Sequence, residues 1–355
     1  MFSVTNDRGF VPQSEQFEGR DMVGEDIKAY KIIHTNDFAY NPARINVGSI
    51  AMYTGERPCM ISSLYVCFKT TKEVNNEWLM QLLKTPKMNY YYNVNGEGGV
   101  RVYLFYPNFA RIRMSIPKIE EQKKIAKLLN LIDERIATQN KIIDKLQSLI
   151  KGLNDFLYTQ YGGEVLTSFT ELGTSYSGLS GKSAQDFGSG KPFITYLNVY
   201  SNNVIKENDF QYVAIKDDEK QNVVKYGDVL FTLSSETPEE VGVGSVYLGK
   251  EKVYLNSFCF GIHITNTEVA FSPYLSYYVS LTAFRKFIYP YAQRSTRFNL
   301  CKADFEKASI KLPTLADQKR IYSVLGHIDC KIETERQMLN LYNSQKQYLL
   351  RQMFI

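Results

Sequence analysis

The sequence predicts an α+β protein: two β-rich mixed modules and two long helices packed as an antiparallel coiled coil, in a pseudo-twofold repeat. The first observation is a duplication, because IPKIEEQKKIAKLLNLIDERI, which begins at Ile116, returns ungapped as LPTLADQKRIYSVLGHIDCKI from Leu312. Both stretches open long segments in which apolar residues follow a heptad spacing. Runs rich in Val, Ile, Tyr and Phe precede each of them and are bounded by Gly, Asn or Pro, as expected of strands.

The repeat gives the expected boundaries. Residues 1–115 form the first module, 116–161 the first helix, 162–311 the second module and 312–355 the second helix. The second module has a lead-in, EVLTSFTELG, without a counterpart before MFSVTNDRG. We therefore expect an initial strand of the first module to be missing or truncated. Among the strand candidates, RVYLFY closes the first module.

The two helical segments carry the same seam. Apolar residues recur in alternating steps of four and three from Ile125 to Leu157, except at Gln139, and Glu335 interrupts the second segment at the equivalent position. Antiparallel packing would set Gln139 across from Glu335, in a rod on the order of 60 Å. The open alternative is that each helix packs only on its own module. A second apolar stripe offers a surface to partner helices: Leu128, Leu131, Ile142, Leu149, Phe156, Val324 and Met338.

Composition narrows the class of protein. The chain has 355 residues, 44% of them hydrophobic and 22% charged, which is typical of a globular protein of two or three domains. Its net charge of +5 only modestly favours polyanionic partners. Neither a signal peptide nor a membrane-spanning run is present, so we expect a cytoplasmic protein without membrane contact. Five cysteines without a C-x-x-C pair predict reduced thiols.

The motifs of catalysis are absent. There is no phosphate-binding G-x-x-x-x-G-K-[ST] loop, and no two of the three histidines are spaced i, i+4. Acidic pairs occur without nuclease spacing. We therefore expect no catalytic residues and no metal site, which leaves binding as the function.

Each module is followed by a helix that opens I/L-P-x-x-x-Q-K-x-I and continues to I-D, and this pattern resembles the specificity subunit of type I restriction-modification systems. GDVLFTLSSE and SFTELG are similar to parts of that family's target-recognition domains. The resemblance implies a non-catalytic subunit whose two recognition domains each read one half of a bipartite, gapped site in double-stranded DNA. It implies helices that set the spacing and dock methyltransferase subunits, which restriction subunits join. The chain itself would hold no cofactor, and S-adenosylmethionine would bind the methyltransferase partner.

Polar and basic loops are the candidates for DNA contact. In the equivalent loops 93–101 and 291–297, Arg101 matches Arg297 and favours phosphate positioning, whereas the residues that differ favour base reading. The segments TGERP and SSETPEE add a second pair. The full candidate set is Arg44, Arg57, Asn95, Arg101, Lys182, Ser234, Ser235, Thr237, Gln293, Arg294, Ser295 and Arg297.

Two other functions stay open from the sequence. One is a coiled-coil adaptor whose modules bind protein ligands. The other is the recognition half of a single-chain restriction-methylation enzyme.

Overall fold

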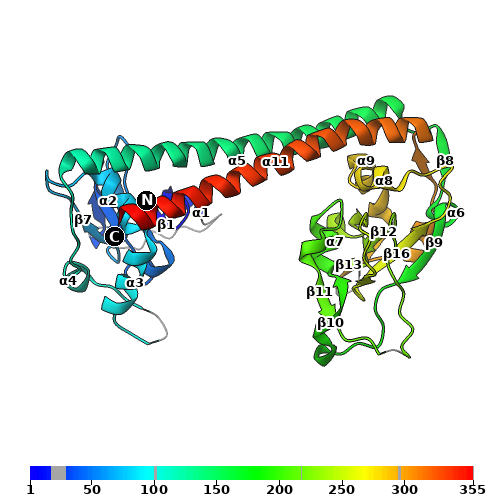
Figure 1. Cartoon of the computed structure of the whole chain (residues 1–355), viewed down its shortest axis with the longest axis horizontal. Coiled ribbons are helices and arrows are strands. Elements are labelled where there is room, and N and C mark those ends of the chain that lie inside the picture. Colours follow the sequence, from blue (N-terminus) through cyan, green and yellow to red (C-terminus); the bar gives the residue numbers. More distant parts are fainter. Residues whose placement is uncertain (17–28, 100–101, 217, 295–296, 355) are drawn as a thin grey trace. The chain divides into compact units, whose positions relative to one another are not determined.

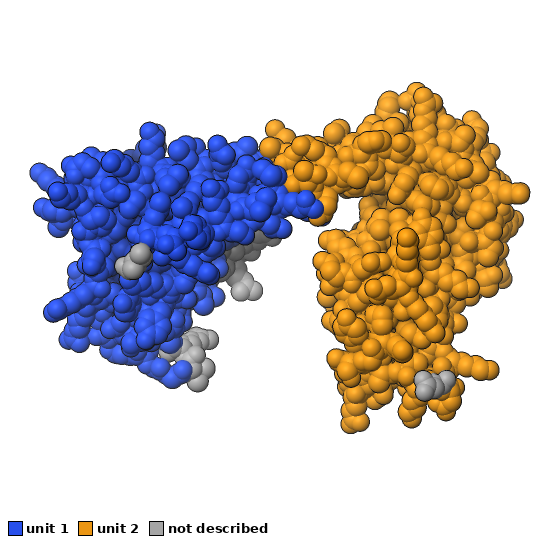
Figure 2. All heavy atoms as spheres, in the orientation of Figure 1, with its two compact units in different colours: residues 1–141, 336–355 blue, residues 142–335 orange. Residues whose placement is uncertain are grey.

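A computed structural model of the chain describes residues 1–16, 29–99, 102–216, 218–294 and 297–354 (Figure 1). The chain divides into two compact units, coloured separately in Figure 2: unit 1 comprises residues 1–141 and 336–355, and unit 2 comprises residues 142–335. Each unit combines a mixed module of strands and short helices with part of both long helices. The predicted α+β fold class is confirmed.

The long helices are α5 (Ile119–Tyr161) and α11 (Leu315–Met353). In unit 1, Asp133 of α5 forms an ion pair with Lys346 of α11. In unit 2, the guanidinium of Arg320 in α11 lies 5.7 Å from the ring centre of Tyr161 in α5. In both units the early part of one helix meets the late part of the other, so the two helices run antiparallel.

Both helices also contribute to both cores. Leu350 and Phe354, at the end of α11, are buried in the core of unit 1, while Leu153 of α5 packs against the core of unit 2. The alternative in which each helix packs only on its own module is therefore wrong. Gln139 and Glu335 are 7% and 9% exposed. Their apposition stays a prediction, because they belong to different units.

The described residues of unit 1 form two small sheets. The first has the order β2-β1-β6-β3 and the second the order β5-β4-β7. The strands are β1 (Phe2–Thr5), β2 (Gly9–Pro12), β3 (Lys31–Ile33), β4 (Phe38–Tyr40), β5 (Ile50–Met52), β6 (Cys59–Ile61) and β7 (Val66–Phe68). The short helices are α1 (Gln13–Gln16), α2 (Asn76–Leu83), α3 (Pro86–Asn95) and α4 (Tyr106–Phe109). Of the strand predicted at RVYLFY, Arg101 lies outside the described residues. In residues 102–106 the prediction is wrong: Tyr103 makes an isolated bridge to Glu97, and α4 begins at Tyr106, where Pro107 suits the first turn of a helix.

In the part of unit 2 that the structure describes, the strands form four sheets, ordered β14-β12-β16-β9, β11-β10-β15, β13-β18-β17 and β19-β8. The strands are β8 (Val165–Thr167), β9 (Gly173–Ser177), β10 (Phe187–Ile194), β11 (Gln211–Val213), β12 (Val229–Thr232), β13 (Ser234–Ser235), β14 (Gly244–Val246), β15 (Tyr254–Leu255), β16 (Cys259–Ile264), β17 (Ala292–Arg294), β18 (Phe298–Leu300) and β19 (Ile310–Leu312). The short helices are α6 (Phe169–Leu172), α7 (Tyr196–Ser201), α8 (Ser272–Tyr278), α9 (Thr282–Ile288) and α10 (Lys302–Lys307).

The central sheets of the two units correspond strand by strand. In unit 1, β4 pairs antiparallel with β5 and β7, and in unit 2, β12 pairs antiparallel with β14 and β16. An aspartate precedes the central strand in both, where Asp37 accepts a hydrogen bond from the backbone of His34 and Asp228 from that of Lys225. Unit 2 adds a fourth strand, β9, at the free edge of β16.

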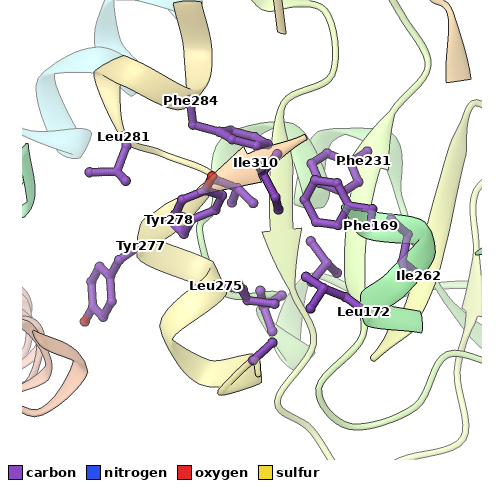
Figure 3. Close-up of a cluster of buried hydrophobic side chains, with 14 of the residues drawn as sticks. Phe169, Leu172, Phe231, Ile262, Leu275, Tyr277, Tyr278, Leu281, Phe284 and Ile310 are labelled. Atoms are coloured by element: carbon purple, nitrogen blue, oxygen red, sulfur yellow. The ribbon is translucent and has the colours of Figure 1, made fainter. Parts of the chain in front are cut away.

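The core of unit 2 is aromatic (Figure 3). The ring of Phe169 lies 5.3 Å from that of Phe231 and 5.2 Å from that of Phe305. Figure 3 shows Phe169 and Leu172, both from α6, pointing into this cluster. Each such side chain stabilises the fold by about 1.5–3 kcal/mol when fully buried, so the lead-in before β9 is integral to unit 2.

Within the described residues, none of the helices is long and apolar enough to cross a membrane.

Candidate nucleic-acid interface

Two candidate loops far apart in the sequence meet in unit 2. Strand β13 pairs with β18, and β18 pairs with β17, so Ser234 and Gln293 both lie opposite Asn299 in one three-stranded sheet. At its edge, the exposed guanidinium of Arg297 lies 3.5 Å from the carboxylate of Glu236. We call residues 234–242 together with β17 and β18 the loop pair of unit 2.

The first loop of this pair, residues 234–242, is held in place by a side chain of α9. Arg285 of α9 donates hydrogen bonds to three backbone carbonyls, at 2.8 Å to Glu239, 2.6 Å to Val241 and 2.7 Å to Gly242. A guanidinium is cationic at neutral pH, so these bonds are charge-assisted and strong, while burial lowers the pKa of Arg285. The loop therefore has a fixed base and an exposed outer side, which suits a recognition surface.

A carboxylate fastens the same loop to α7. Glu240 accepts hydrogen bonds from the hydroxyl of Tyr200 at 2.6 Å and from that of Ser235 at 3.0 Å. The Tyr200 bond, followed by those from Ser235 and Thr237, lowers the pKa of Glu240. Tyr196 stacks on Tyr200 with an interplanar angle of 15°. Sequence reasoning missed Tyr200 and Arg285, since neither lies in a polar loop.

Unit 1 assembles the same two loops. The connection between β4 and β5 lies against the segment after α3, because the backbone amide of Leu104 donates to the carbonyl of Pro42 at 3.0 Å. In unit 2, the amide of Leu300, 196 residues later, donates to Leu233 at 2.8 Å. The bridge between Glu97 and Tyr103 likewise corresponds to the pairing of Gln293 with Asn299. We call residues 41–49 and 93–104 the loop pair of unit 1.

Arg44 is the basic candidate in the loop pair of unit 1. It is exposed and lies at the N-terminal end of a 3-10 turn, Ile45–Val47. Next to it, the amide of Asn46 donates to the side-chain carbonyl of Asn93 at 3.1 Å, which joins the two loops. The loop pair of unit 1 thus contains an exposed arginine and two amide side chains, the residue types that read base edges and phosphates.

Other candidates lie elsewhere or have local partners. Arg57 is exposed, but it lies between β5 and β6, outside the loop pair. Asn95 is the last residue of α3, and its amide donates to the carbonyl of Tyr91 at 2.9 Å. Lys182 has a side chain only 8% exposed, which forms an ion pair with Glu219.

The remaining candidates divide by position. Ser235 is buried, and Thr237 is exposed and precedes the 3-10 turn Pro238–Glu240. Gln293 is exposed on β17, and Arg294 ends that strand. Arg101 and Ser295 lie outside the described residues.

A buried glutamine fixes the start of α5 to unit 1. The side chain of Gln122 is fully buried; it accepts from the amide of Asn75 at 2.7 Å and donates to the carbonyls of Glu73 at 2.9 Å and Pro117 at 2.8 Å. Gln318, also fully buried, repeats the three bonds 196 residues later in unit 2, with Phe271 at 2.8 Å, Val269 at 2.8 Å and Pro313 at 2.9 Å. We call these residues the glutamine anchors. The repeated Gln of the helix motif was visible in the sequence. The backbone groups to which it bonds were not.

Farther along each long helix, an aspartate attaches the helix to its module a second time. Asp133 accepts from the amide of Gln81 at 2.9 Å, and its equivalent Asp329 accepts from the hydroxyl of Tyr277. Burial, followed by the bond to Asp329, raises the pKa of Tyr277. The motif residues Gln and Asp thus orient each long helix on the module that precedes it.

One buried pair has the composition of a catalytic dyad. Nδ1 of His263 lies 2.8 Å from the carboxylate of Asp228, which also accepts from the hydroxyl of Tyr176 at 2.7 Å. Burial raises the pKa of Asp228. In unit 1, the equivalent Asp37 has two basic neighbours, Nδ1 of His34 at 3.6 Å and the ammonium of Lys69 at 3.7 Å, so a basic partner for this aspartate recurs. The recurrence indicates a structural pair that holds the turn before the central strand.

No three His, Cys, Asp or Glu side chains gather into a possible metal site in the part of the chain that the structure describes.

Comparison with known proteins gives a consistent result. The sequence model described as type I restriction modification DNA specificity domain matches residues 25–148 and 177–341. A curated relative from Methanocaldococcus jannaschii, the putative type I restriction enzyme MjaX specificity subunit, is 26% identical over 348 residues. That match covers 89% of this chain and 76% of the relative.

Two solved structures share the fold. One comes from work on complex assembly and conformational transition of the type I R-M system; its TM-score is 0.58 at 16% identity, covering 91% of this chain and 83% of that one. The other is the type I restriction-modification system S subunit from M. genitalium, with a TM-score of 0.53 at 12% identity and coverages of 91% and 84%. At identities this low, the two structures support a shared fold and nothing further.

Proposed function

The chain belongs to the type I restriction modification DNA specificity family, and on that premise we propose that it is the non-catalytic DNA-recognition subunit of a type I restriction-modification complex. In this proposal, residues 1–115 and 162–311 are the recognition domains, and each reads one half of a bipartite, gapped site. Residues 116–161 and 312–355 set the spacing between the half-sites. The complex acts on chromosomal and invading DNA, which places it in the cytoplasm.

One observation carries the proposal: both units assemble an equivalent loop pair with different side chains at equivalent positions. Glu97 and Tyr103 in unit 1 stand where Gln293 and Asn299 stand in unit 2. Equivalent backbones presenting different polar groups suit two modules that read two different half-sites.

The chemistry of the exposed side chains fits duplex DNA. The amide of Gln293 can donate and accept at the edge of an adenine, and the guanidinium of Arg44 can bind a guanine or a phosphate. Arg297 can exchange Glu236 for a phosphate at small cost, because an exposed ion pair contributes at most about 1 kcal/mol.

Partner subunits supply the reaction. The second apolar stripe stays exposed on α5 and α11, from 37% at Ile142 and Met338 to 60% at Phe156. We assign this stripe to the docking of methyltransferase subunits, to which the restriction subunits add. Base flipping and methylation with S-adenosylmethionine take place on those partners, and this chain only positions them.

A hairpin exchange tests the proposal. Residues 95–103 are replaced by residues 291–299, which have the same length and the same position in the repeat. The chain is produced with its methyltransferase subunits, and methylated motifs are mapped by methylome sequencing. We expect one half of the gapped motif to change while the other half stays the same.

Two controls sharpen the result. Lys250→Ala alters an exposed residue outside both loop pairs and should leave the motif unchanged. An exchanged chain that assembles normally and still yields the original motif would contradict loop-based reading. Methylation of DNA by the purified chain alone would contradict the non-catalytic assignment.

A further inference from the structure

The two units differ at one edge strand. In unit 2, β19 is covered by β8, with Ile310 opposite Thr167 and Leu312 opposite Val165, and its two apolar residues are 2% and 0% exposed. The equivalent segment of unit 1 is Met114–Ile116, where Ile116 is 48% exposed. Within the described residues this segment forms no strand and its backbone makes no hydrogen bond. Unit 1 thus presents an unpaired, partly apolar edge where unit 2 has a covered one.

A groove lies along this edge. Its volume is about 600 Å³, and all of its lining residues belong to unit 1, among them Trp78, Met88, Met114, Ile116 and Phe354. We call it the unit 1 groove. In unit 2 the residue equivalent to Phe354 is Tyr158 of α5, whose hydroxyl donates to the carbonyl of Lys311 at 2.9 Å, and β8 then pairs with β19.

The segment that follows β8 makes two further contacts in unit 2. Phe169 and Leu172 of α6 enter the aromatic core, and β9 pairs with β16 over five residues. In unit 1, β7 has β4 as its only strand partner among the described residues. Phe109, the counterpart of the fully buried Phe305, is only partly buried. The pairing of β8 with β19, the packing of Phe169 and Leu172, and the pairing of β9 with β16 therefore each have an uncovered counterpart in the described part of unit 1.

We propose that the unit 1 groove and the free edge of β7 form one docking site for a peptide segment with the chemistry of residues 165–177. The ligand is an apolar strand, then a Ser-Phe-x-x-Leu turn, then a second strand. Strand addition would satisfy the free backbone groups of Met114–Ile116, and the Phe and Leu side chains would fill the uncovered core.

Two basic residues give the unit 1 groove a preference for acidic peptides. Lys87 and Arg113 line the groove and are exposed, at positions where unit 2 has Ala283 and Ser309. A peptide with acidic residues beside its apolar ones, such as EVLTSFTELG, therefore suits the groove better than a neutral one.

The sole tryptophan of the chain reports on this site, because Trp78 lines the groove. A synthetic peptide of residues 164–178 is titrated into the full-length chain while tryptophan emission and the anisotropy of a labelled peptide are recorded. We expect a saturable change in both. A control peptide carrying Phe169→Asp and Leu172→Asp should bind at least about tenfold more weakly.

A variant of the chain distinguishes specific docking from nonspecific hydrophobic binding of the peptide. Ile116→Asp alters an exposed side chain in the groove and should reduce peptide affinity by at least about tenfold with an unchanged circular dichroism spectrum. Absence of a saturable signal, or equal binding of both peptides, would overturn the proposal. The assay contains no DNA, so its outcome is independent of the proposed recognition function.

Discussion

The glutamine anchors and the loop pairs are both repeated, but in opposite ways. Gln122 and Gln318 are the same residue, fully buried, with three equivalent backbone partners. The loop pairs share backbone contacts, yet their side chains differ, as Glu97 and Gln293 illustrate. The duplicated unit thus keeps the groups that attach a helix to a module and varies the groups that face outward. This difference fits the proposal that the two modules read different half-sites.

The strongest test of this comparison removes an anchor. Gln122→Met keeps the side-chain volume but leaves the backbone groups of Asn75 and Glu73 buried without partners. We expect the free energy of unfolding to fall by about 3 kcal/mol, measured by urea denaturation with Trp78 emission. Gln147→Met on the exposed face of α5 is the matched control and should change stability by less than about 0.5 kcal/mol. Equal stability of the two variants would show that the anchor has no such role.

The next test concerns a support that belongs to unit 2 alone. Arg285→Met leaves the carbonyls of Glu239, Val241 and Gly242 without their donor, while the equivalent residue in unit 1 is Asn89. We expect a loss of about 2 kcal/mol in stability and weaker reading of one half-site.

Urea denaturation and methylome sequencing measure the two effects of Arg285→Met. Lys286→Met, at the exposed neighbouring position, is the control. Equal losses at both half-sites would argue against a support specific to one loop pair.

In unit 2, substitutions should distinguish a residue that contacts phosphate from one that reads a base. Arg297→Ala should weaken binding to all sequences and reduce the salt dependence of binding by about one unit of slope. Gln293→Ala should instead lower discrimination at one base pair, by about 1 kcal/mol. Binding of the assembled complex to matched and mismatched duplexes at several salt concentrations distinguishes them. If both variants change the salt slope alike, the division of roles is wrong.

The smallest expected effect is a shift in the pKa of one carboxyl group. Hydrogen bonds from Tyr200 first, then Ser235 and Thr237, hold the pKa of Glu240 below its ordinary value of 4.5. A carboxyl whose pKa is lowered in the folded state stabilises the loop above the unfolded pKa, and this contribution is lost as the pH falls through the folded pKa. Tyr200→Phe removes the largest cause, so the pKa of Glu240 should rise toward 4.5. An NMR titration of the side-chain carboxyl measures it, and an unchanged midpoint would contradict the assignment.

The sequence predicted the features that depend on local pattern. Heptad spacing gave the long helices and their antiparallel packing, since each step of three or four residues is visible within a few turns. The loop residues Gln293 and Ser234 were predicted from composition, but their meeting in one sheet depends on strands more than fifty residues apart. Lys182 shows the limit, because its partner Glu219 lies in another loop and turns the ammonium inward. The partners of the glutamine anchors were equally invisible, since backbone groups leave no trace in composition.

The split of the chain between units has a consequence for synthesis. Unit 2 is a continuous stretch, residues 142–335, whereas the core of unit 1 includes Leu350 from the last turn of α11 and Phe354 just after it. The module translated first therefore cannot complete its core until all of unit 2 and most of α11 have been translated. Unit 2 needs no residue from outside its own stretch, so the order in which the two units are completed is the reverse of the order in which they begin. Premature termination within α11 would leave the aromatic core around Trp78 without its final residues, marking such a chain for aggregation or proteolysis.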